Sequence, residues 1–427
     1  MKQYIKQLIL LIATLSSSLP GNAQDSLSYY LEHAALNNPG VKAKYLEYSA
    51  ALEKVPQASS LPDPELQFGY FIKPMQLLMG NQVADIRLMQ MFPWFGVLKA
   101  AKDEASKIAV AKFESFRDAK EELYFNVKSS YYQVYRTIYE IGIANKNLDI
   151  LKSLEQIVLV KFSTGGAGSS SGSGMSGSGK NDMVNLLRVQ IEMHELENRI
   201  ALLQDQLTTD KVSFNRYLNR VPSSEVFTGD SLTEVPVPSD ILTLADSLVN
   251  HPMVKMFEAE SEANASKLAM VTRMGYPMIG LGLNYSIVKK RDGVPPMMNG
   301  NDMIMPMISV TLPIYRKKYK AMRHEAEFMR DAATVSAENV TNNLRVNFQE
   351  TLQNLNDAGR RVKLYTEQAL LANKSVQLLI TSFSANGTDF EEVLRMEQQL
   401  LDYQFKKVEA VVDKNTSISQ LIYLTGN

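Results

Sequence analysis

Residues 183–217 read MVNLLRVQIEMHELENRIALLQDQLTTDKVSFNRY. Apolar or aromatic side chains recur along this stretch at alternating steps of three and four residues, with one polar interruption at Asp210. The series is Leu186, Val189, Met193, Leu196, Ile200, Leu203, Leu207, Phe214 and Tyr217. This spacing predicts one long helix with a coiled-coil seam.

The same spacing precedes this helix. It predicts an outgoing helix with apolar positions at Phe113, Phe116, Leu123, Val127, Val134, Ile141, Ala144, Leu148, Leu151 and Val158. Its polar interruptions are Lys120, Ser130, Thr137 and Glu155. We therefore expect Phe95 to about Tyr217 to form two antiparallel helices joined by a Gly/Ser-rich reversal at Gly165 to Gly179. The outgoing helix would span roughly 100 Å at a rise of about 1.5 Å per residue.

The composition of the chain argues against several classes of function. The 427 residues carry a net charge of -1 and have a pI near 6.5, which argues against a nucleic-acid partner. The absence of cysteine excludes disulfides, cysteine metal sites, thiol nucleophiles and a lipid-modified N-terminal cysteine.

The N-terminal segment is typical of a secretory signal. Lys2 and Lys6 precede an apolar run from Leu8 to Leu15, and small residues lead to an expected cleavage after Ala23. No later segment offers about 18 uncharged apolar residues, so we expect no transmembrane helix.

The chain contains an internal duplication. Ser26 to Asn37 is helical by pattern and stops before Pro39, while Ile241 to Val249 is helical by pattern and stops before Pro252. Placing Pro39 on Pro252 gives an offset of 213 (252 - 39), which also aligns Lys42 with Lys255, Glu47 with Glu260, Pro64 with Pro277 and Gly69 with Gly282. Such self-similarity indicates two structural repeats.

The correspondence continues beyond the long helices. Pro93 lies 69 residues before Phe162 and Pro313 lies 70 residues before Phe383 (162 - 93 and 383 - 313). Past the reversals, Asp182 and Leu187-Arg188 match Asp389 and Leu394-Arg395 at an offset of 207 (389 - 182). The first reversal is longer because it contains the low-complexity Gly/Ser tract, whose composition predicts flexibility.

Each repeat also predicts a β-hairpin before its long helix. Apolar and polar residues alternate over 64–72, 83–92, 279–286 and 307–312. The apolar positions are Leu66, Phe68, Tyr70, Ile72, Ala84, Ile86, Leu88, Phe92, Ile279, Leu281, Leu283, Tyr285, Ile308, Val310 and Leu312. Short strands with one apolar and one polar face are what a membrane barrel needs. Four strands cannot close a barrel and open edges are not tolerated in lipid, so three copies would supply 12 strands.

The ordered duplication of these features resembles the TolC family of outer membrane efflux channels over the whole mature chain. The resemblance implies a mainly α fold with a membrane β-barrel: a homotrimer with a 12-stranded barrel in the outer membrane lipids and an α-helical periplasmic tunnel. It implies docking onto an inner-membrane transporter through a periplasmic adaptor protein. The expected segments are a signal peptide (1–23), a first repeat (24–225, hairpins at about 63–93 and 95–220) and a second repeat (226–427, hairpins at about 277–313 and 315–425).

The resemblance also implies roles for residues near the reversals. The family's periplasmic tips, where the adaptor is expected to touch, match Gly165, Gly166 and Gly387. Some members narrow the aperture with an acidic ring, and the matching position is Arg395, with Glu391 and Glu392 close by. Because Arg395 departs from the acidic pattern, cation binding at the closed end is not carried over.

Catalysis finds little support in the sequence. The histidines His33, His194, His251 and His324 are scattered, and Gly168 to Gly172 fits G-x-S-x-G only inside the Ser/Gly tract. We therefore expect no enzyme and no cofactor.

Methionine is the more informative residue, with 21 in the chain. Alternation predicts a lumen-facing position for Met89, Met91 and Met307, and the same parity for Met303 and Met305 if the strand continues through Pro306. Thioethers suit Cu(I) or Ag(I), whereas methionine also fills gaps as an ordinary apolar residue.

The function expected is a passive outer membrane exit duct of a tripartite pump that exports copper, silver or drugs. The alternatives are a protein-secretion duct and a structural periplasmic coiled coil.

Overall fold

A computed structural model describes residues 27–165, 178–229, 233–237, 243–293, 299–386 and 390–426. The expected signal segment 1–23, Gly166, Gly387 and most of the Gly/Ser tract lie outside these residues. The helices are α2 (Leu27–Asn37), α3 (Pro39–Ser59), α4 (Val97–Gly165), α5 (Ser178–Leu218), the 3-10 helix η2 (Thr243–Asn250), α6 (Pro252–Met274), α7 (Arg316–Asn386) and α8 (Phe390–Thr425). The strands are β1 (Glu65–Leu77), β2 (Gly80–Phe92), β3 (Met278–Lys289) and β4 (Met303–Thr311).

The described chain divides into two compact units. One combines 1–42, 119–248 and 344–427, and the other combines 43–118 and 249–343. Each unit takes segments from both sequence repeats, because α4 and α7 begin in one unit and end in the other. Among the described helices, none has an apolar stretch long enough to cross a bilayer.

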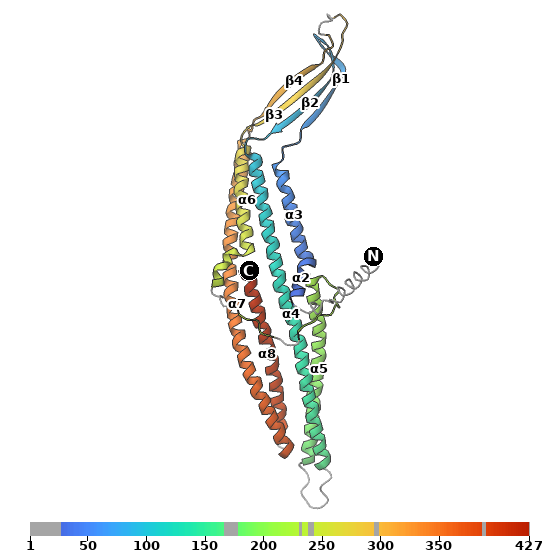
Figure 1. The fold of residues 1–427 in the computed structure, drawn as a ribbon, viewed down its shortest axis with the longest axis vertical. Helices are drawn as coiled ribbons and strands as arrows, with labels where there is room; N and C mark the ends of the chain where they lie inside the picture. The colour runs from blue at the N-terminus through green and yellow to red at the C-terminus, as the bar shows by residue number, and fades with distance from the viewer. Residues whose placement is uncertain are drawn as a thin grey trace, which may run out of the picture. The chain divides into compact units, whose positions relative to one another are not determined.

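The two expected helical hairpins are confirmed. Helix α4 has 69 residues and α7 has 71, and each is followed by a returning helix, α5 or α8. Figure 1 shows α5 running back along the second part of α4 and α8 along the second part of α7. Leu186, Val189, Leu196, Ile200 and Phe214 of the predicted seam are buried.

Two predicted seam positions, Phe113 and Phe116, contact α3 instead of a returning helix, and the ring of Phe116 lies 5.6 Å from that of Tyr45. Phe113 is 38% exposed, and its ring lies 5.3 Å from that of Tyr48 on α3. Helix α3, not a returning helix, covers this turn of α4, so the seam pattern does not apply there.

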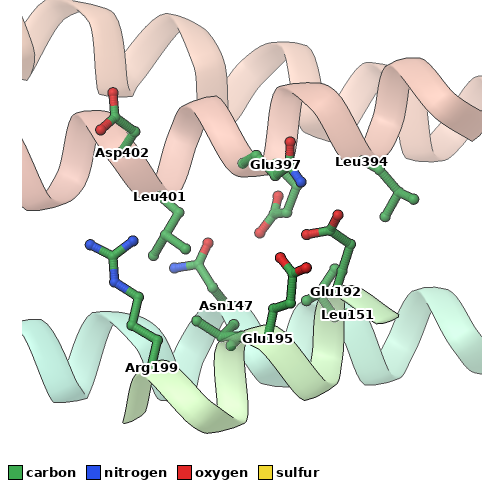
Figure 2. Close-up of a pocket in the computed structure, with 11 residues that line it drawn as sticks. Asn147, Leu151, Glu192, Glu195, Arg199, Leu394, Glu397, Leu401 and Asp402 are labelled. Atoms are coloured by element: carbon green, nitrogen blue, oxygen red, sulfur yellow. The ribbon is translucent and has the colours of Figure 1, made fainter. Parts of the chain in front are cut away.

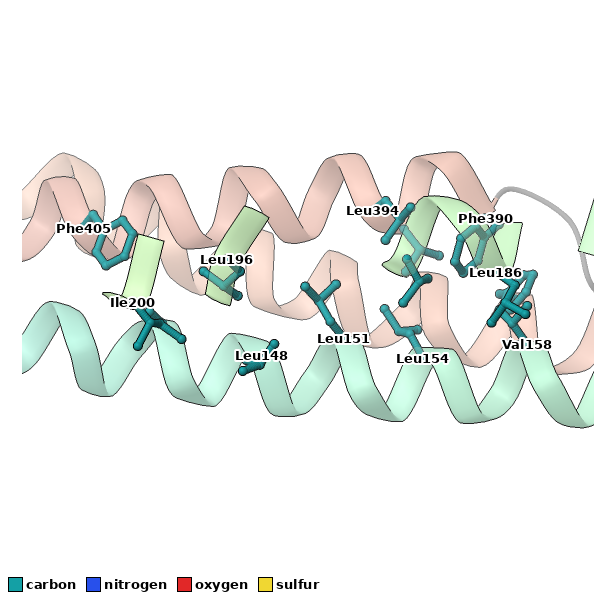
Figure 3. Close-up of a cluster of buried hydrophobic side chains, with 14 residues drawn as sticks. Leu148, Leu151, Leu154, Val158, Leu186, Leu196, Ile200, Phe390, Leu394 and Phe405 are labelled. Atoms are coloured by element: carbon teal, nitrogen blue, oxygen red, sulfur yellow. The ribbon is translucent and has the colours of Figure 1, made fainter. Parts of the chain in front are cut away.

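The ends of both helical hairpins that lie next to the reversals share one hydrophobic core, shown in Figure 3. Its buried members come from four helices: Ala144, Leu148, Leu151, Leu154 and Val158 of α4, Leu186, Val189, Leu196 and Ile200 of α5, Phe383 of α7, and Phe390, Val393, Leu394 and Phe405 of α8. The rings of Phe383 and Phe390 lie 4.9 Å apart and pack the end of α7 against the start of α8. Burial of these side chains is the main stabilising contribution here.

Two polar interruptions of the seam in α4, Thr137 and Glu155, are paired with side chains of α5. Thr137 Oγ1 of α4 donates to Asp210 Oδ2 of α5 at 2.7 Å, and both residues are buried. Gln206 Nε2 donates to the other carboxylate oxygen of Asp210 at 2.7 Å. Nearer the reversal, Gln190 Nε2 donates to Glu155 Oε1 at 2.9 Å. These pairs tie α4 and α5 to one axial register, because a shift would leave buried polar groups without partners.

The Pro39 and Pro252 breaks are capped in related ways. Asn38 Oδ1 accepts from the backbone N–H of Gly40 and Val41, at 2.9 and 3.2 Å. His251 Nδ1 accepts from the N–H of Met253 at 3.2 Å. Each proline therefore occupies the first helical position, where its missing N–H costs nothing.

The helix expected from Ile241 to Val249 is instead the 3-10 helix η2, and Ile241 lies outside the described residues. The residue before a proline avoids the helical region, and His251 has φ -57° and ψ 136°. A segment of eight residues that must end there remains in the tighter 3-10 form.

The strands form one antiparallel sheet in the order β1-β2-β3-β4. The central pair, β2 with β3, joins the hairpins of the two repeats, and β1 and β4 form the edges. The strands extend beyond the predicted segments, and β4 continues through Pro306. An edge strand tolerates proline because the missing N–H can point away from its neighbour.

We expect Thr137→Val to lower the free energy of unfolding by about 1–3 kcal/mol, because it removes a buried donor from the Asp210 carboxylate. Urea denaturation of the purified chain in detergent measures the change. Thr208→Val is the matched control, since the exposed Thr208 hydroxyl bonds only to Gln204 O of its own helix. Equal effects of the two substitutions would contradict a role for the buried pair.

Candidate functional site

The sheet has an exposed apolar face. Register places Leu66, Leu88 and Leu283 in one row across β1, β2 and β3. The exposed fractions of the large exposed hydrophobic side chains on this face run from 37% for Ile279 to 78% for Tyr70. The large exposed side chains are Leu66, Phe68, Tyr70, Leu88, Ile279, Leu281, Leu283, Ile304, Ile308 and Val310. A contiguous apolar patch of this kind marks an interaction surface, unlike isolated exposed leucines.

The opposite face carries polar residues and methionines. Gly282 pairs with both Met89 and Met307, Asn284 pairs with Met305, and Ser286 pairs with Met303. Met91 pairs with Gly280 and so has the same parity. All five methionines named from the sequence therefore share one face with Asp85, Arg87, Asn284, Ser286 and Ser309.

Two of these thioethers converge. Ser309 Oγ lies 3.6 Å from Met89 Sδ and 3.7 Å from Met91 Sδ. Both side chains lie over glycines: a Cβ on Gly280 would come within 2.6 Å of Met91 Sδ, and one on Gly282 within 2.8 Å of Met89 Cε. The missing side chains at Gly280 and Gly282 thus make room for two soft sulfur atoms beside one hydroxyl. Met303 and Met305 are more exposed, further along β4.

In the described residues, no three His, Cys, Asp or Glu side chains form a group that could hold a metal ion. The thioethers on this face are soft ligands.

The residues assigned to the tips and aperture are placed in part. Gly165 is the last residue of α4, whereas Gly166 and Gly387 lie outside the described residues. Arg395 pairs with Glu392 one turn earlier on α8, and Arg188 Nη1 of α5 lies 3.0 Å from Glu391 Oε2. Arg188 and Arg395 occupy matching positions in the two repeats, and both pair with acidic residues in the first turn of α8. Acidic side chains are favourable there because the N-terminus of a helix carries a partial positive charge.

A buried carboxylate was not predicted from the sequence. Glu397 of α8 is 3% exposed, and neither of its oxygens has a hydrogen-bond partner among the described residues. Burial raises its pKa to about 7. It lines a cavity of about 260 Å³ between α4, α5 and α8, where Figure 2 shows it pointing toward Glu192 and Glu195 of α5. The sequence did contain a sign of this buried carboxylate, because Glu397 interrupts the apolar series of Val393, Leu394 and Leu400.

The repeats explain why this carboxylate lacks a partner. The offset of 207 places Glu397 on Gln190, which hydrogen-bonds to Glu155 in the first hairpin. The offset of 221 (383 - 162) places Val376 on Glu155. The second hairpin therefore has a carboxylate in place of the amide donor on α8, and an apolar residue in place of the carboxylate that accepted from it.

Comparisons with known proteins show the fold. No protein-family model matches the chain, and no curated protein matches its sequence. Its structure is similar to that of CusC, described in relation to transmembrane channel formation (TM-score 0.73, 16% identity, 94% of this chain and 92% of that one). It is also similar to the Neisseria gonorrhoeae MtrE outer membrane channel (TM-score 0.73, 13% identity, 94% of this chain and 89% of that one). A third similar structure is the Vibrio cholerae outer membrane protein VceC (TM-score 0.72, 14% identity, 94% of this chain and 96% of that one).

These similarities extend over nearly the whole length of both chains. The mainly helical fold with a small antiparallel sheet is thus the fold of outer membrane channels, as the sequence resemblance implied. At this identity the shared property is the fold itself.

We expect Glu397→Gln to stabilise the chain at pH 8 by up to about 3 kcal/mol. The folded-state pKa of about 7 exceeds the reference value of 4.5, so the native carboxyl stabilises the fold below that reference and loses this contribution as pH rises through 7. The advantage of the glutamine should therefore shrink as pH falls and vanish below the reference pKa of 4.5. Thermal unfolding against pH measures it, with the exposed Glu367→Gln on α7 as control. A glutamine variant that is less stable than the native chain at pH 8 would contradict the argument.

Proposed function

We propose that the chain is one subunit of a trimeric outer membrane efflux channel. The observation that carries this proposal is the exposed apolar face of the sheet, opposite a face of polar residues and methionines. A strand with one lipid-compatible face and one polar face suits the wall of a water-filled barrel. The similarity of fold to outer membrane channels supports the same location.

Trimerisation follows from the open sheet edges. Within the described chain, β1 and β4 are the edge strands. An edge in lipid leaves backbone groups without hydrogen bonds, each costing several kcal/mol. Pairing β4 of one copy with β1 of the next removes these edges, and three copies close a barrel of 12 strands within the usual size range. The copies' helical hairpins would form the periplasmic tunnel.

Export through this duct is passive, with the energy supplied by an inner-membrane transporter acting through a periplasmic adaptor. We assign adaptor contact to the two reversals, at Gly165, Gly166 and Gly387, and the aperture to Arg395 with Glu391 and Glu392. The paired acidic and basic groups at the start of α8 support an aperture held by ion pairs. No catalysis or cofactor is needed for this role. A protein-secretion duct would have the same architecture, whereas a structural coiled coil would have no use for the apolar sheet face.

Copper or silver is the proposed cargo, with amphiphilic drugs as the alternative. In a trimer, Met89, Met91, Met303, Met305 and Met307 would line one polar lumen with thioethers. The convergence of Met89 and Met91 on Ser309 supports contact with soft monovalent ions. Weak sites in series suit conduction, because an ion must leave as readily as it enters.

Val310→Asp should reduce the trimer in outer membranes, because a charge on the lipid face of a barrel costs up to about 2–4 kcal/mol at the midplane and less for Asp or near the interface. Thr311→Asp is the matched control: it is the next residue on β4, exposed, and on the opposite face. Membrane fractionation and gel migration without heating measure the trimer. Equal effects of both substitutions, or a stable soluble monomer from the native chain, would contradict the proposal.

Changing the five methionines to leucine should lower tolerance to copper or silver in a strain that depends on this channel, while tolerance to detergents is retained. Leucine preserves apolar volume but removes the soft sulfur ligand. Growth at graded metal concentrations measures the effect. Met253 and Met329 changed together to leucine provide the control, since they are exposed on helices α6 and α7 and not on the strands. Unchanged metal tolerance in the five-fold variant would favour the drug alternative.

A further inference from the structure

The cavity that contains Glu397 has an exposed rim and a buried floor. Glu195, Arg199 and Asp402 at the rim are exposed, whereas Glu397 and Asn147 at the floor are each only 3% exposed. Leu151, Leu196, Leu394 and Leu401 supply apolar walls. The cavity therefore leads from charged groups near solvent to unpaired polar groups in the interior.

The floor presents hydrogen-bond acceptors without donors. Neither Glu397 Oε1 nor Oε2 has a partner among the described residues, and the same holds for Asn147 Oδ1. The Asn147 amide is oriented by its nitrogen, which donates to Ile143 O at 2.8 Å and to Gln404 Oε1 at 3.0 Å. Three buried acceptor atoms in one cavity call for a ligand rich in N–H or O–H donors.

The charges around the cavity also favour a cation. Glu192 and Glu195 of α5 make no ion pair or hydrogen bond with a described residue, whereas Asp402 is paired with Lys406. Among the described lining residues, Arg199 is the single cation, and its guanidinium lies 4.2 Å from the centroid of the Phe405 ring. Helix α4 contributes only the neutral Asn147 and Leu151. The single guanidinium of Arg199 therefore faces three carboxylates without an ion pair, those of Glu192, Glu195 and Glu397, so the cavity carries an excess of negative charge.

We propose that this cavity binds a primary ammonium group carried on a short aliphatic chain. An ammonium has three N–H donors and no acceptor, which matches the acceptors of Glu397 and Asn147 and the additional carboxylate of Glu195. Its methylene groups suit the leucine walls. A bare metal ion is a poorer match, because no three acidic or histidine side chains in the described residues form a metal-binding group.

Two sources offer this chemistry: a free alkyl diamine and the lysine side chain of a partner protein. Both remain protonated throughout the range in which Glu397 titrates, since the ordinary pKa of such an amine is about 10. Binding should therefore weaken as Glu397 is protonated, and loss of this pH dependence in Glu397→Gln would assign it to this carboxylate rather than to Glu192, Glu195 or Asp402.

Isothermal titration calorimetry of the full chain in detergent tests the proposal, with 1,4-diaminobutane and N-acetyl-lysine amide as probes and 1,4-butanediol as the uncharged control. We expect saturable binding of an amine at pH 8, a loss of at least tenfold in affinity for Glu397→Gln, and no loss for Glu367→Gln. Affinity for the native chain should fall several-fold at pH 6, and that for the glutamine variant should not. Tighter binding of the diamine identifies a free amine, and tighter binding of the lysine amide identifies a protein side chain.

The variants also separate misfolding from lost binding. Circular dichroism and thermal unfolding establish that Glu397→Gln is folded, and Asn147→Leu provides a second, independent change at the floor. Absence of saturable amine binding to the native chain would overturn the proposal. Equal affinity in the native chain and both floor variants, or equal binding of 1,4-butanediol, would overturn it as well.

Discussion

The pairing of β2 with β3 is the interaction on which the sheet depends. It joins two hairpins that are far apart in sequence, running from Asn81 opposite Lys289 to Phe92 opposite Ile279. Because side chains alternate along a strand, this single register decides which residues share a face. A slip of one residue would place Met89 and Met91 among leucines and put charged Asp85 on the apolar face. The same pairing leaves β1 and β4 as edges, and the need to satisfy them motivates assembly into a trimer.

Helix pairing in the other unit combines burial with polar pairs that specify register. A seam of leucine and valine tolerates sliding by whole turns, because one apolar contact resembles the next. Buried Thr137 opposite Asp210 and Gln190 opposite Glu155 remove that freedom, since the wrong register leaves polar groups unpaired. Positions that interrupt the apolar pattern thus contribute specificity to long helices whose hydrophobic contacts are repetitive.

The features that could be predicted from the sequence were those that follow from the spacing of residues along the chain. Heptad spacing predicted the paired long helices, period-two alternation predicted the faces of the sheet, and the offset from Pro39 to Pro252 predicted two repeats. Contacts between distant polar residues were not predictable, because each interruption of a seam looks alike until the register of both helices is known. Asp210 proved to have a buried partner and Glu397 none, although both are acidic residues at apolar positions. Phe113 followed the seam pattern yet contacts α3, because periodicity does not say which neighbour covers a face.

The sequence difference between the two repeats explains why the Glu397 carboxylate is buried without a hydrogen-bond donor. The first hairpin places Gln190 opposite Glu155, so that carboxylate accepts a hydrogen bond from the amide. In the second hairpin the matching positions are Glu397 and Val376, and burial without a donor raises the pKa of the carboxyl to about 7. An apolar residue at 397 would avoid this cost within a core that already contains Val393, Leu394 and Leu400. A group that opposes folding near neutral pH, beside an unpaired amide oxygen and two further carboxylates, is better explained by a ligand that it receives than by the stability of the helices.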